Sequence, residues 1–239
     1  MASSDNKGII YEEKLNKSLK KIGLEKSSFQ GAGSDSNAPD ALITYCGEDY
    51  KVEVKLDMDV DFGQGSLDYD IKKEKWILGG AKTPSADQMR EFLDMIGVPK
   101  LVNEAWGPKG PPRKFTVPLK LFKKQDVDFD YKNFKNIFVN IPSNSSNAVA
   151  NYYNSKKTYY IQIGGKGFYY MGKDIAKLDI PEFDLKLKLR IRLKRGGSTP
   201  IYNYRFTTAI QAIKNSLTKS DADLDDPEYL KALAARAKG

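Results

Sequence analysis

The sequence predicts an α/β protein. Residues 8–23 carry apolar side chains at helical spacing on one face, and most of their lysines fall on the other. Two runs typical of β-strands, residues 41–46 and 50–56, flank a short turn and predict a hairpin. Residues 184–195 alternate strictly between apolar and basic side chains, the pattern of a half-buried strand. Helix and strand signals thus share one chain, as is typical of an α/β fold.

The first half of the chain follows from these two periodicities. The hairpin turns at residues 47–49, residues 58–64 form an Asp- and Gly-rich loop, and a further strand lies within residues 66–78. Residues 86–96 have helical spacing of apolar side chains and predict a second helix. Residues 97–118 contain several prolines and glycines, which predicts an irregular segment rather than a helix or strand.

The second half is expected to be richer in strands. We expect a strand at residues 137–141, a polar loop at 142–157 and a hairpin at 158–172 that turns at Gly164–Gly167. The basic strand, 184–195, is followed by a turn at Gly196-Gly197 and a strand at 201–206. A helix at 207–218 and a helix-prone tail at 221–239 complete the chain.

The absence of histidine excludes several kinds of active site. The 239 residues include one cysteine and no histidine. A Ser-His-Asp triad, a Cys-His pair, an HExxH zinc site and an HNH-type nuclease all need histidine. Acid–base chemistry would have to use Asp, Glu, Lys, Tyr or a metal-bound water. The single cysteine also excludes a disulfide framework and a CxxC zinc site, so a reducing, intracellular compartment is expected.

The charge balance favours a polyanionic partner. The chain has 39 Lys and Arg against 31 Asp and Glu, a net charge of +8. Nucleic acid is the first candidate, although a modest positive charge is also common in proteins that bind none. A membrane partner is not expected, because no stretch approaches the ~20 apolar residues of a membrane span.

A cluster of charged residues lies on the predicted hairpin. Glu53 and Lys55 are two positions apart on the second strand, so both project from one face while Val54 projects from the other. Asp40 precedes the first strand, and antiparallel pairing through a short turn brings it opposite Glu53. Two carboxylates and one ammonium are therefore expected to converge.

This donor set suits a hard cation. Two carboxylates, the Val54 carbonyl and water ligands match the preferences of Mg²⁺, and Mn²⁺ would substitute. Such a metal lowers the pKa of a bound water and stabilises charge on a phosphate. A lysine beside it, here Lys55, can orient that water or stabilise the developing charge.

The arrangement resembles the PD-(D/E)XK nuclease superfamily. The matching residues are Pro39-Asp40 and Glu53-Val54-Lys55, preceded by a helix that begins Gly8-Ile9-Ile10-Tyr11-Glu12. Many members carry G-x-x-x-E on that helix. The resemblance covers roughly residues 8–96. It implies a restriction-endonuclease-like core, a mixed sheet flanked by helices, here with a β-rich C-terminal elaboration.

Two further residues follow from the resemblance. Glu12 would act on the metal through a water or a second metal ion. A helical wheel independently selects it, because Glu12 lies about 60° from the centre of the apolar stripe and Glu13 about 160° away. A glutamine shortly after the ExK strand recurs near the active site in several branches of the superfamily, and Gln64 takes that place here.

The basic strand offers phosphate contacts. Its cations recur at about 6.8 Å, twice the ~3.4 Å rise per phosphate of one DNA strand. The alternative is an ordinary solvated sheet face or a lysine-protected edge. The expected contacts are those of the basic strand and its neighbour: Lys186, Lys188, Arg190, Arg192, Lys194 and Arg205.

The resemblance implies a Mg²⁺-dependent endonuclease that hydrolyses DNA. Sequence-specific double-strand cleavage of the restriction type is the favoured form, in the cytoplasm of a bacterial or phage-infected cell. A homodimer is a possible assembly for such an enzyme, because two active sites related by a two-fold axis can cut both strands of a palindrome. The alternatives are a phage, repair or recombination nuclease, structure-specific or exonucleolytic, a non-catalytic nucleic-acid-binding protein of the same fold, and an RNA substrate.

We expect four parts along the chain. Residues 1–97 are the first part of the catalytic core and residues 98–157 an irregular insertion. Residues 158–220 form a β-rich basic part that completes the domain or contacts DNA, and residues 221–239 form a tail helix.

Overall fold

The protein forms two compact units, each assembled from separate stretches of chain. The computed structural model describes residues 4–26, 29, 39–142, 146–195 and 204–238. Unit 1 comprises residues 1–60, 149–185 and 213–239, and unit 2 comprises residues 61–148 and 186–212. The chain therefore leaves unit 1 and returns to it twice.

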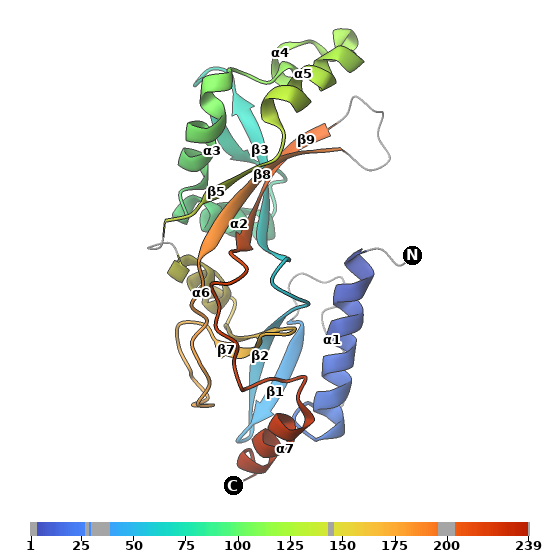
Figure 1. The fold of residues 1–239 in the computed structure, drawn as a ribbon, viewed down its shortest axis with the longest axis vertical. Helices are drawn as coiled ribbons and strands as arrows, with labels where there is room; N and C mark the ends of the chain where they lie inside the picture. The colour runs from blue at the N-terminus through green and yellow to red at the C-terminus, as the bar shows by residue number, and fades with distance from the viewer. Residues whose placement is uncertain (1–3, 27–28, 30–38, 143–145, 196–203, 239) are drawn as a thin grey trace. The chain divides into compact units, whose positions relative to one another are not determined.

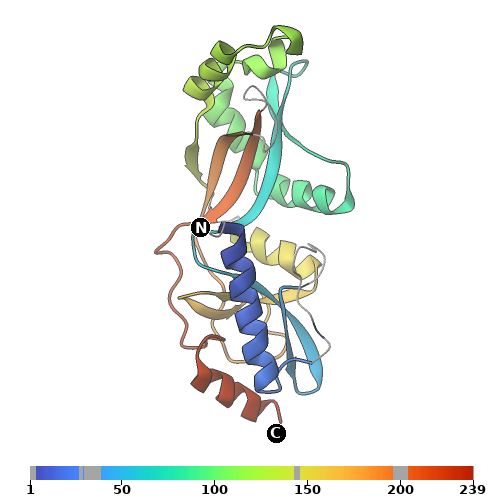
Figure 2. The same ribbon diagram turned by 90° about the vertical axis from the view of Figure 1, so that its right-hand side faces the viewer.

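Unit 1 contains a four-stranded mixed sheet in the order β1-β2-β6-β7. Its strands are β1 (Ala41–Tyr45), β2 (Glu48–Lys55), β6 (Thr158–Ile163) and β7 (Gly167–Tyr170). β2 pairs antiparallel with β1 and parallel with β6, and β6 pairs antiparallel with β7. The unit's helices are α1 (Ser4–Lys21), most of α6 (Ser146–Ser155) and α7 (Pro227–Arg236), with α1 lying along the sheet in Figure 1 and Figure 2.

The core of unit 1 lies between α1 and one face of this sheet. Leu15 and Leu19 of α1 belong to the same buried cluster as Val52 and Val54 of β2, and each of the four is at most 4% exposed. Alternation along β2 then turns Glu53 and Lys55 to the other face. The apolar stripe of the helix and the pleat of the strand together decide where the charged pair lies.

The β1–β2 turn is tighter than the sequence predicts. β2 begins at Glu48, so only Cys46 and Gly47 form the loop. Both have positive φ, 48° and 83°, as in the two-residue turns that match the twist of a hairpin. Glycine takes this conformation without a side-chain clash, which explains its place in the turn.

Unit 2 contains a five-stranded antiparallel sheet in the order β4-β3-β9-β8-β5. Its strands are β3 (Asp61–Asp70), β4 (Lys75–Gly79), β5 (Ile137–Asn140), β8 (Leu187–Arg195) and β9 (Tyr204–Ala212). Its helices are α2 (Pro84–Met95), α3 (Val98–Trp106), α4 (Arg113–Thr116) and α5 (Lys124–Phe134), with the short turns η1 (Gly107–Lys109) and η2 (Leu119–Leu121).

An aromatic cluster and two glycines fix the helices of unit 2 to its sheet. The ring centroid of Trp76 lies 4.8 Å from that of Trp106 and 4.9 Å from that of Phe206. On β3, a Cβ added at Gly63 would come within 2.7 Å of Phe92, and one at Gly65 within 2.5 Å of Leu93. The glycines therefore permit the close approach of α2.

The α/β class and several elements are confirmed. The structure is a mixed α/β protein whose sheets are flanked by helices. The first helix, the hairpin, the second helix, the strands β5 to β7 and the basic strand all occur at the expected places. The tail helix is α7, shorter than the expected span. The expected turn at Gly196-Gly197 lies outside the described residues.

Four expected elements are wrong, and two of them are segments that form helices instead. Residues 97–118 contain α3, since Pro99 occupies the first turn, where a missing N–H costs nothing, and Val98, Val102 and Trp106 form one buried stripe. The polar run 142–157 contains α6, whose small and aromatic side chains are buried. The other two are the loop expected at residues 58–64 and the helix expected at residues 207–218.

The loop predicted for residues 58–64 ends early, because β3 begins at Asp61. The helix predicted for residues 207–218 is instead the second half of β9. β9 is hydrogen-bonded on both sides, to β3 and β8, and residues 206–212 are all buried. A strand in that position is apolar on both faces and shows no alternation, so periodicity alone does not separate it from a helix.

A search of the described helices finds none that is both long and apolar enough to cross a membrane.

Candidate active site

The hairpin of unit 1 places Glu53 and Lys55 together on the face opposite α1. The Lys55 ammonium donates a hydrogen bond to Glu53 Oε1, and the two side chains are 17% and 18% exposed. The neighbouring Val52 and Val54 are 0% and 4% exposed and belong to the core. The face predicted from the alternation is thus the one observed.

Asp40 lies where β1 begins and is fixed by two hydrogen bonds. Its Oδ2 accepts from the Val54 backbone N–H at 2.9 Å. Its backbone carbonyl accepts from Asn16 Nδ2 at 2.9 Å, and Asn16 is on α1 one turn beyond Glu12. The Asp40 carboxylate therefore bridges to β2, while its backbone holds α1.

The backbone of β2 also turns the Val54 carbonyl to the β1 side of the strand, the side on which Asp40 lies. Gly164 N–H donates to the Lys55 carbonyl at 2.9 Å, so the Lys55 carbonyl points to the β6 side. Successive backbone groups of a strand point to opposite sides, and the Val54 N–H indeed bonds Asp40 on the β1 side. The Val54 carbonyl points to the same β1 side as the Val54 N–H, beyond Val52, which pairs with the first residue of β1, Ala41.

A tyrosine from α6 completes the surroundings of Glu53. The Tyr153 hydroxyl donates to Glu53 Oε1 at 3.0 Å, and Tyr153 is 4% exposed. Oε1 therefore accepts from both Lys55 and Tyr153, and Oε2 is the oxygen of Glu53 that neither of these donors occupies.

The charges of this cluster act on one another. Burial and the Asp40 carboxylate raise the pKa of Glu12 to about 7. Burial and the Glu53 carboxylate raise the pKa of Asp40 to about 6. Burial lowers the pKa of Lys55, but the nearby carboxylates outweigh it and the pKa is raised overall. Lys55 is thus held as an ammonium among carboxylates that repel each other.

The residues fit a hard cation that keeps part of its water shell. Asp40 and Glu53 supply carboxylate oxygens and Val54 a carbonyl. Among the residues that the structure describes, no group of three or more Asp, Glu or Cys side chains forms a ready metal site. Mg²⁺ is commonly bound through one or two carboxylates and several waters, so this smaller donor set suits it. The carboxylate repulsion noted above is what a cation would relieve.

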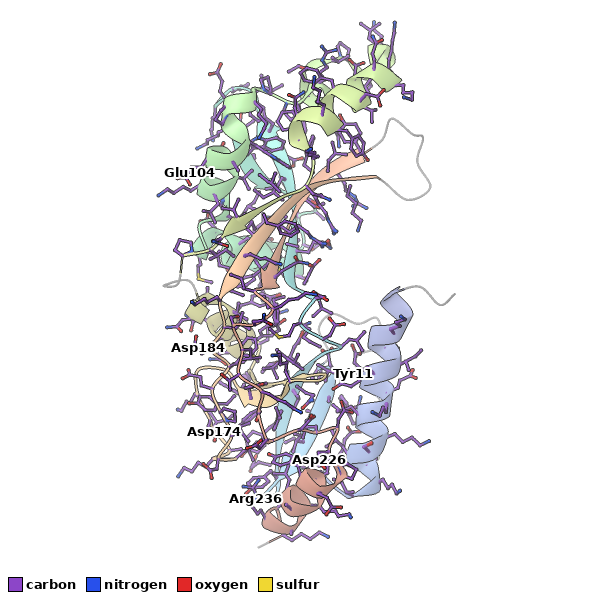
Figure 3. All side chains as sticks on the ribbon, viewed as in Figure 1. Tyr11, Glu104, Asp174, Asp184, Asp226 and Arg236 are labelled. Atoms are coloured by element: carbon purple, nitrogen blue, oxygen red, sulfur yellow. The ribbon has the colours of Figure 1, made fainter. Side chains whose placement is uncertain are left out.

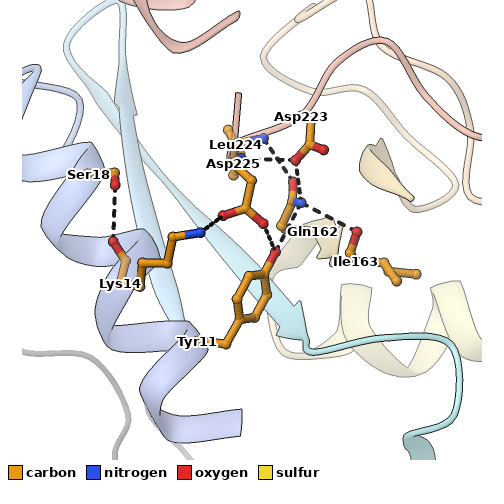
Figure 4. A network of polar contacts seen from close by, with 8 residues as sticks. All are labelled: Tyr11, Lys14, Ser18, Gln162, Ile163, Asp223, Leu224 and Asp225. Atoms are coloured by element: carbon orange, nitrogen blue, oxygen red, sulfur yellow. Dashed lines mark hydrogen bonds and ion pairs between the residues drawn. The ribbon is translucent and has the colours of Figure 1, made fainter. Parts of the chain in front are cut away.

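A buried network attaches α1, and with it Glu12, to the rest of unit 1 (Figure 4). Tyr11, which precedes Glu12, donates to Asp225 Oδ2 at 2.6 Å. Gln162 of β6, 0% exposed, donates to Asp223 at 2.7 Å and to the Tyr11 hydroxyl at 3.3 Å. Figure 3 shows Tyr11 on the side of α1 that faces the strands. The sequence interpretation of Glu12 also holds locally, since Glu12 is half-buried and Glu13 exposed.

Unit 2 carries the basic face, defined as Lys186, Lys188, Arg190, Arg192, Lys194 and Arg205. Leu187, Leu189, Ile191 and Leu193 are 0–7% exposed between these cations, so the predicted alternation of β8 is confirmed.

The two arginines of β8 within the basic face, Arg190 and Arg192, are held by hydrogen bonds to other side chains. Arg190 pairs with Asp61 through contacts of 2.9 and 3.1 Å. Arg192 donates to Gln64 Oε1 at 2.7 Å and to Thr207 Oγ1 at 3.1 Å. Lys194 and Arg205 are exposed and lie opposite each other in the β8–β9 register. The guanidinium groups of Arg190 and Arg192 are thus oriented, whereas Lys186, Lys194 and Arg205 are the exposed cations of the face.

Gln64 belongs to unit 2, on β3, whereas Asp40, Glu53, Lys55 and Glu12 belong to unit 1. Its described partner is Arg192 of the basic face. Its role next to the metal stays a prediction from the resemblance.

The sequence interpretation missed three residues of the site. Tyr153 and Lys156 lie within the run read as a polar loop, and Lys156 is near enough to Asp40 for its charge to oppose the rise in the Asp40 pKa. Asn16 has no role in the sequence interpretation, and in the structure it is only 9% exposed. A buried polar residue on an apolar helix border is the one signal that could have identified Asn16.

Comparisons with known proteins give one distant similarity. Neither a known family profile nor a curated protein sequence matches this chain. Among solved structures, the HhaI endonuclease in complex with DNA is similar, with 12% sequence identity over 95% of this chain and 98% of that chain and a TM-score of 0.45. A match at this TM-score and identity leaves the function to be argued from this chain's own residues.

Proposed function

We propose that the chain is a Mg²⁺-dependent endonuclease that hydrolyses DNA phosphodiester bonds. The observation that carries the proposal is the meeting of Asp40, Glu53 and Lys55 on one hairpin, with Glu12 close enough for its charge to interact with theirs. Without histidine, a carboxylate–lysine metal site is the remaining common route to this hydrolysis.

Each side chain has a separate task in this proposal. Asp40, Glu53 and the Val54 carbonyl would hold the cation. A bound Mg²⁺ would polarise the phosphate and lower the pKa of a coordinated water. The Lys55 ammonium orients the attacking water and stabilises negative charge on the phosphate. Glu12, whose pKa is about 7, accepts a proton or a water hydrogen bond at the edge of the site.

The basic face supports DNA as the substrate. Its exposed cations, Lys186, Lys194 and Arg205, and the oriented guanidinium of Arg192 suit phosphate oxygens. We propose sequence-specific double-strand cleavage of the restriction type, carried out by a homodimer when the site is palindromic.

The test is cleavage of plasmid and linear DNA in Mg²⁺, in Mn²⁺ and in EDTA. Wild type is expected to cut only with metal, and Asp40→Ala to lose at least about 100-fold in rate. Lys17→Ala, an exposed change on α1, is the control and keeps wild-type activity. Metal-independent cutting, or an Asp40→Ala variant as active as wild type, contradicts the proposal.

The products distinguish the kinds of nuclease. Discrete fragments with one end sequence support the restriction type, whereas laddering or shortening from the ends supports a repair or exonucleolytic enzyme. A non-catalytic binding protein would bind DNA tightly without cleaving it. In that case the heat of Mg²⁺ binding in titration calorimetry would be the same for Asp40→Asn and wild type.

A further inference from the structure

A short turn in unit 2 presents two leucines to solvent. Leu119 is 88% exposed and Leu121 is 55% exposed, both within η2. The Leu121 N–H donates to the Pro118 carbonyl at 2.8 Å, and the Phe122 N–H donates to the Leu119 carbonyl at 3.2 Å. The proline and these bonds define the backbone of the turn, so the leucines are displayed from a fixed geometry.

Both flanks of this turn are attached to Tyr204, the first residue of β9. The Phe122 ring lies 5.8 Å from the Tyr204 ring. The Lys114 ammonium donates to the Tyr204 carbonyl and lies 5.4 Å from its ring centroid. Tyr204 is 1% exposed, and the next residue, Arg205, is part of the basic face. The leucine turn therefore adjoins one end of that face.

The turn is strongly basic. Residues 113–125 contain five Lys and Arg residues and no Asp or Glu. Lys120 stands between the two leucines, and Lys123 and Lys124 follow. Lys124 pairs with Asp128, and Arg113 pairs with Asp126, which lies just beyond this run. Residues 113–130 thus keep an excess of positive charge, five Lys and Arg against three Asp, and Lys120 and Lys123 are the cations next to the leucines.

We propose that Leu119 and Leu121 form a wedge that enters the minor groove of duplex DNA and unstacks a base step, while the flanking lysines contact phosphates. Apolar side chains on a basic surface are used in this way by proteins that kink DNA. The inference rests on the proposed function for its DNA partner. A second copy of the chain is a poorer occupant, because two such basic surfaces repel each other. A lipid surface is poorer too, because two side chains on a turn offer little apolar area compared with an amphipathic helix.

The test measures DNA binding and base unstacking in Ca²⁺, which is used in place of Mg²⁺ to limit cleavage. The probe is a duplex with 2-aminopurine at successive steps of the mapped cleavage site, or a mixed-sequence duplex if no cleavage is found. Wild type is expected to raise the 2-aminopurine fluorescence. The double change Leu119→Ser and Leu121→Ser is expected to abolish that rise and weaken binding at least about fivefold.

Met95→Ser is the matched control, since Met95 is 60% exposed on α2, outside the basic face. It is expected to bind and unstack as wild type does. Circular dichroism checks that all variants are folded, which exposed substitutions should allow.

Three results would overturn the wedge. One is wild-type affinity and fluorescence in the double variant. Another is leucine-dependent binding to phosphatidylserine vesicles without any leucine dependence on DNA. A third is loss of a dimer in sedimentation with unchanged DNA unstacking. If wild type unstacks DNA but does not cleave it, the proposed function is refuted and the wedge is kept. If the double variant binds, unstacks and cleaves DNA as wild type does, the wedge is refuted and the proposed function is kept.

Discussion

The Tyr153 hydroxyl donates a hydrogen bond to Glu53 Oε1 at 3.0 Å, across 100 residues of sequence. Because Lys55 donates to the same oxygen, Glu53 is held by two donors through Oε1. The carboxylate is thereby fixed in rotation, with Oε2 directed elsewhere. Tyr153 is a positioning residue for Glu53 in this account.

Tyr153→Phe is therefore expected to lower kcat about tenfold with little change in KM for DNA, because it loosens a metal-holding carboxylate without touching substrate. It should also raise the Mg²⁺ concentration needed for half-maximal rate. Tyr69→Phe, the same change on β3 of unit 2, is the control. Equal Mg²⁺ dependence in Tyr153→Phe and wild type would show that the hydroxyl does not position Glu53.

The raised carboxyl pKa values predict a pH-dependent stability of the metal-free protein. The pKa of Glu12 is about 7, against an ordinary value near ~4.3 in the unfolded chain. The folded state binds the Glu12 proton more tightly than the unfolded chain does, so ionisation of Glu12 destabilises the fold. This destabilisation is absent below pH ~4 and fully present above pH ~7.

Glu12→Gln removes that cost and is expected to stabilise the metal-free protein at pH 8 by about 1 kcal/mol, after allowance for solvent screening of a half-buried side chain, and hardly at all at pH 4. Thermal unfolding in EDTA at both pH values measures it. The exposed Glu13→Gln is the control. Parallel Tm curves for Glu12→Gln and wild type across this range would refute the charge coupling.

The network around Gln162 predicts a loss of stability when it is cut. Gln162 is 0% exposed and its Oε1 accepts from the Leu224 N–H at 3.1 Å. Gln162→Ala leaves that N–H and the Asp223 carboxylate without this partner, at a cost of about 2 kcal/mol. Urea unfolding measures it, with the exposed Gln125→Ala as the control. An unchanged midpoint would mean that the network does not stabilise the fold.

The basic face predicts different effects for its accessible and its paired cations. Lys194→Ala is expected to weaken DNA binding and to reduce the slope of log affinity against log salt by about 1. Arg190→Ala is expected mainly to lower the free energy of unfolding, because it leaves Asp61 without its ion pair. Lys75→Ala, an exposed change on β4, is the binding control. A Lys194→Ala variant with the wild-type salt slope contradicts the phosphate contact.

Periodicity predicted those parts of the fold where one face is buried and the other is not. Val52 and Val54 against Glu53 and Lys55, and the alternation of β8, follow from the two-residue repeat of a strand. The stripe of α1 follows from the helical repeat, and it placed Glu12 rather than Glu13 toward the interior.

The same reasoning failed where polar or uniformly buried residues form regular structure. α6 consists mostly of Ser, Asn, Ala and Tyr, so its helical stripe was hidden, and Tyr153 was missed with it. β9 is a central strand buried on both faces, which removes the alternation. Each unit is built from separate segments of the chain. Strand pairs such as β2 with β6, which join distant segments within unit 1, are not encoded by any local pattern.

The most direct test of the account is the rate of Mg²⁺-dependent plasmid cleavage by wild type and by Lys55→Ala, measured side by side at saturating protein. Wild type is expected to cut and Lys55→Ala to be at least about 100-fold slower, although it still binds DNA. An intact plasmid with wild type in Mg²⁺, or equal rates for the two proteins, would contradict the account.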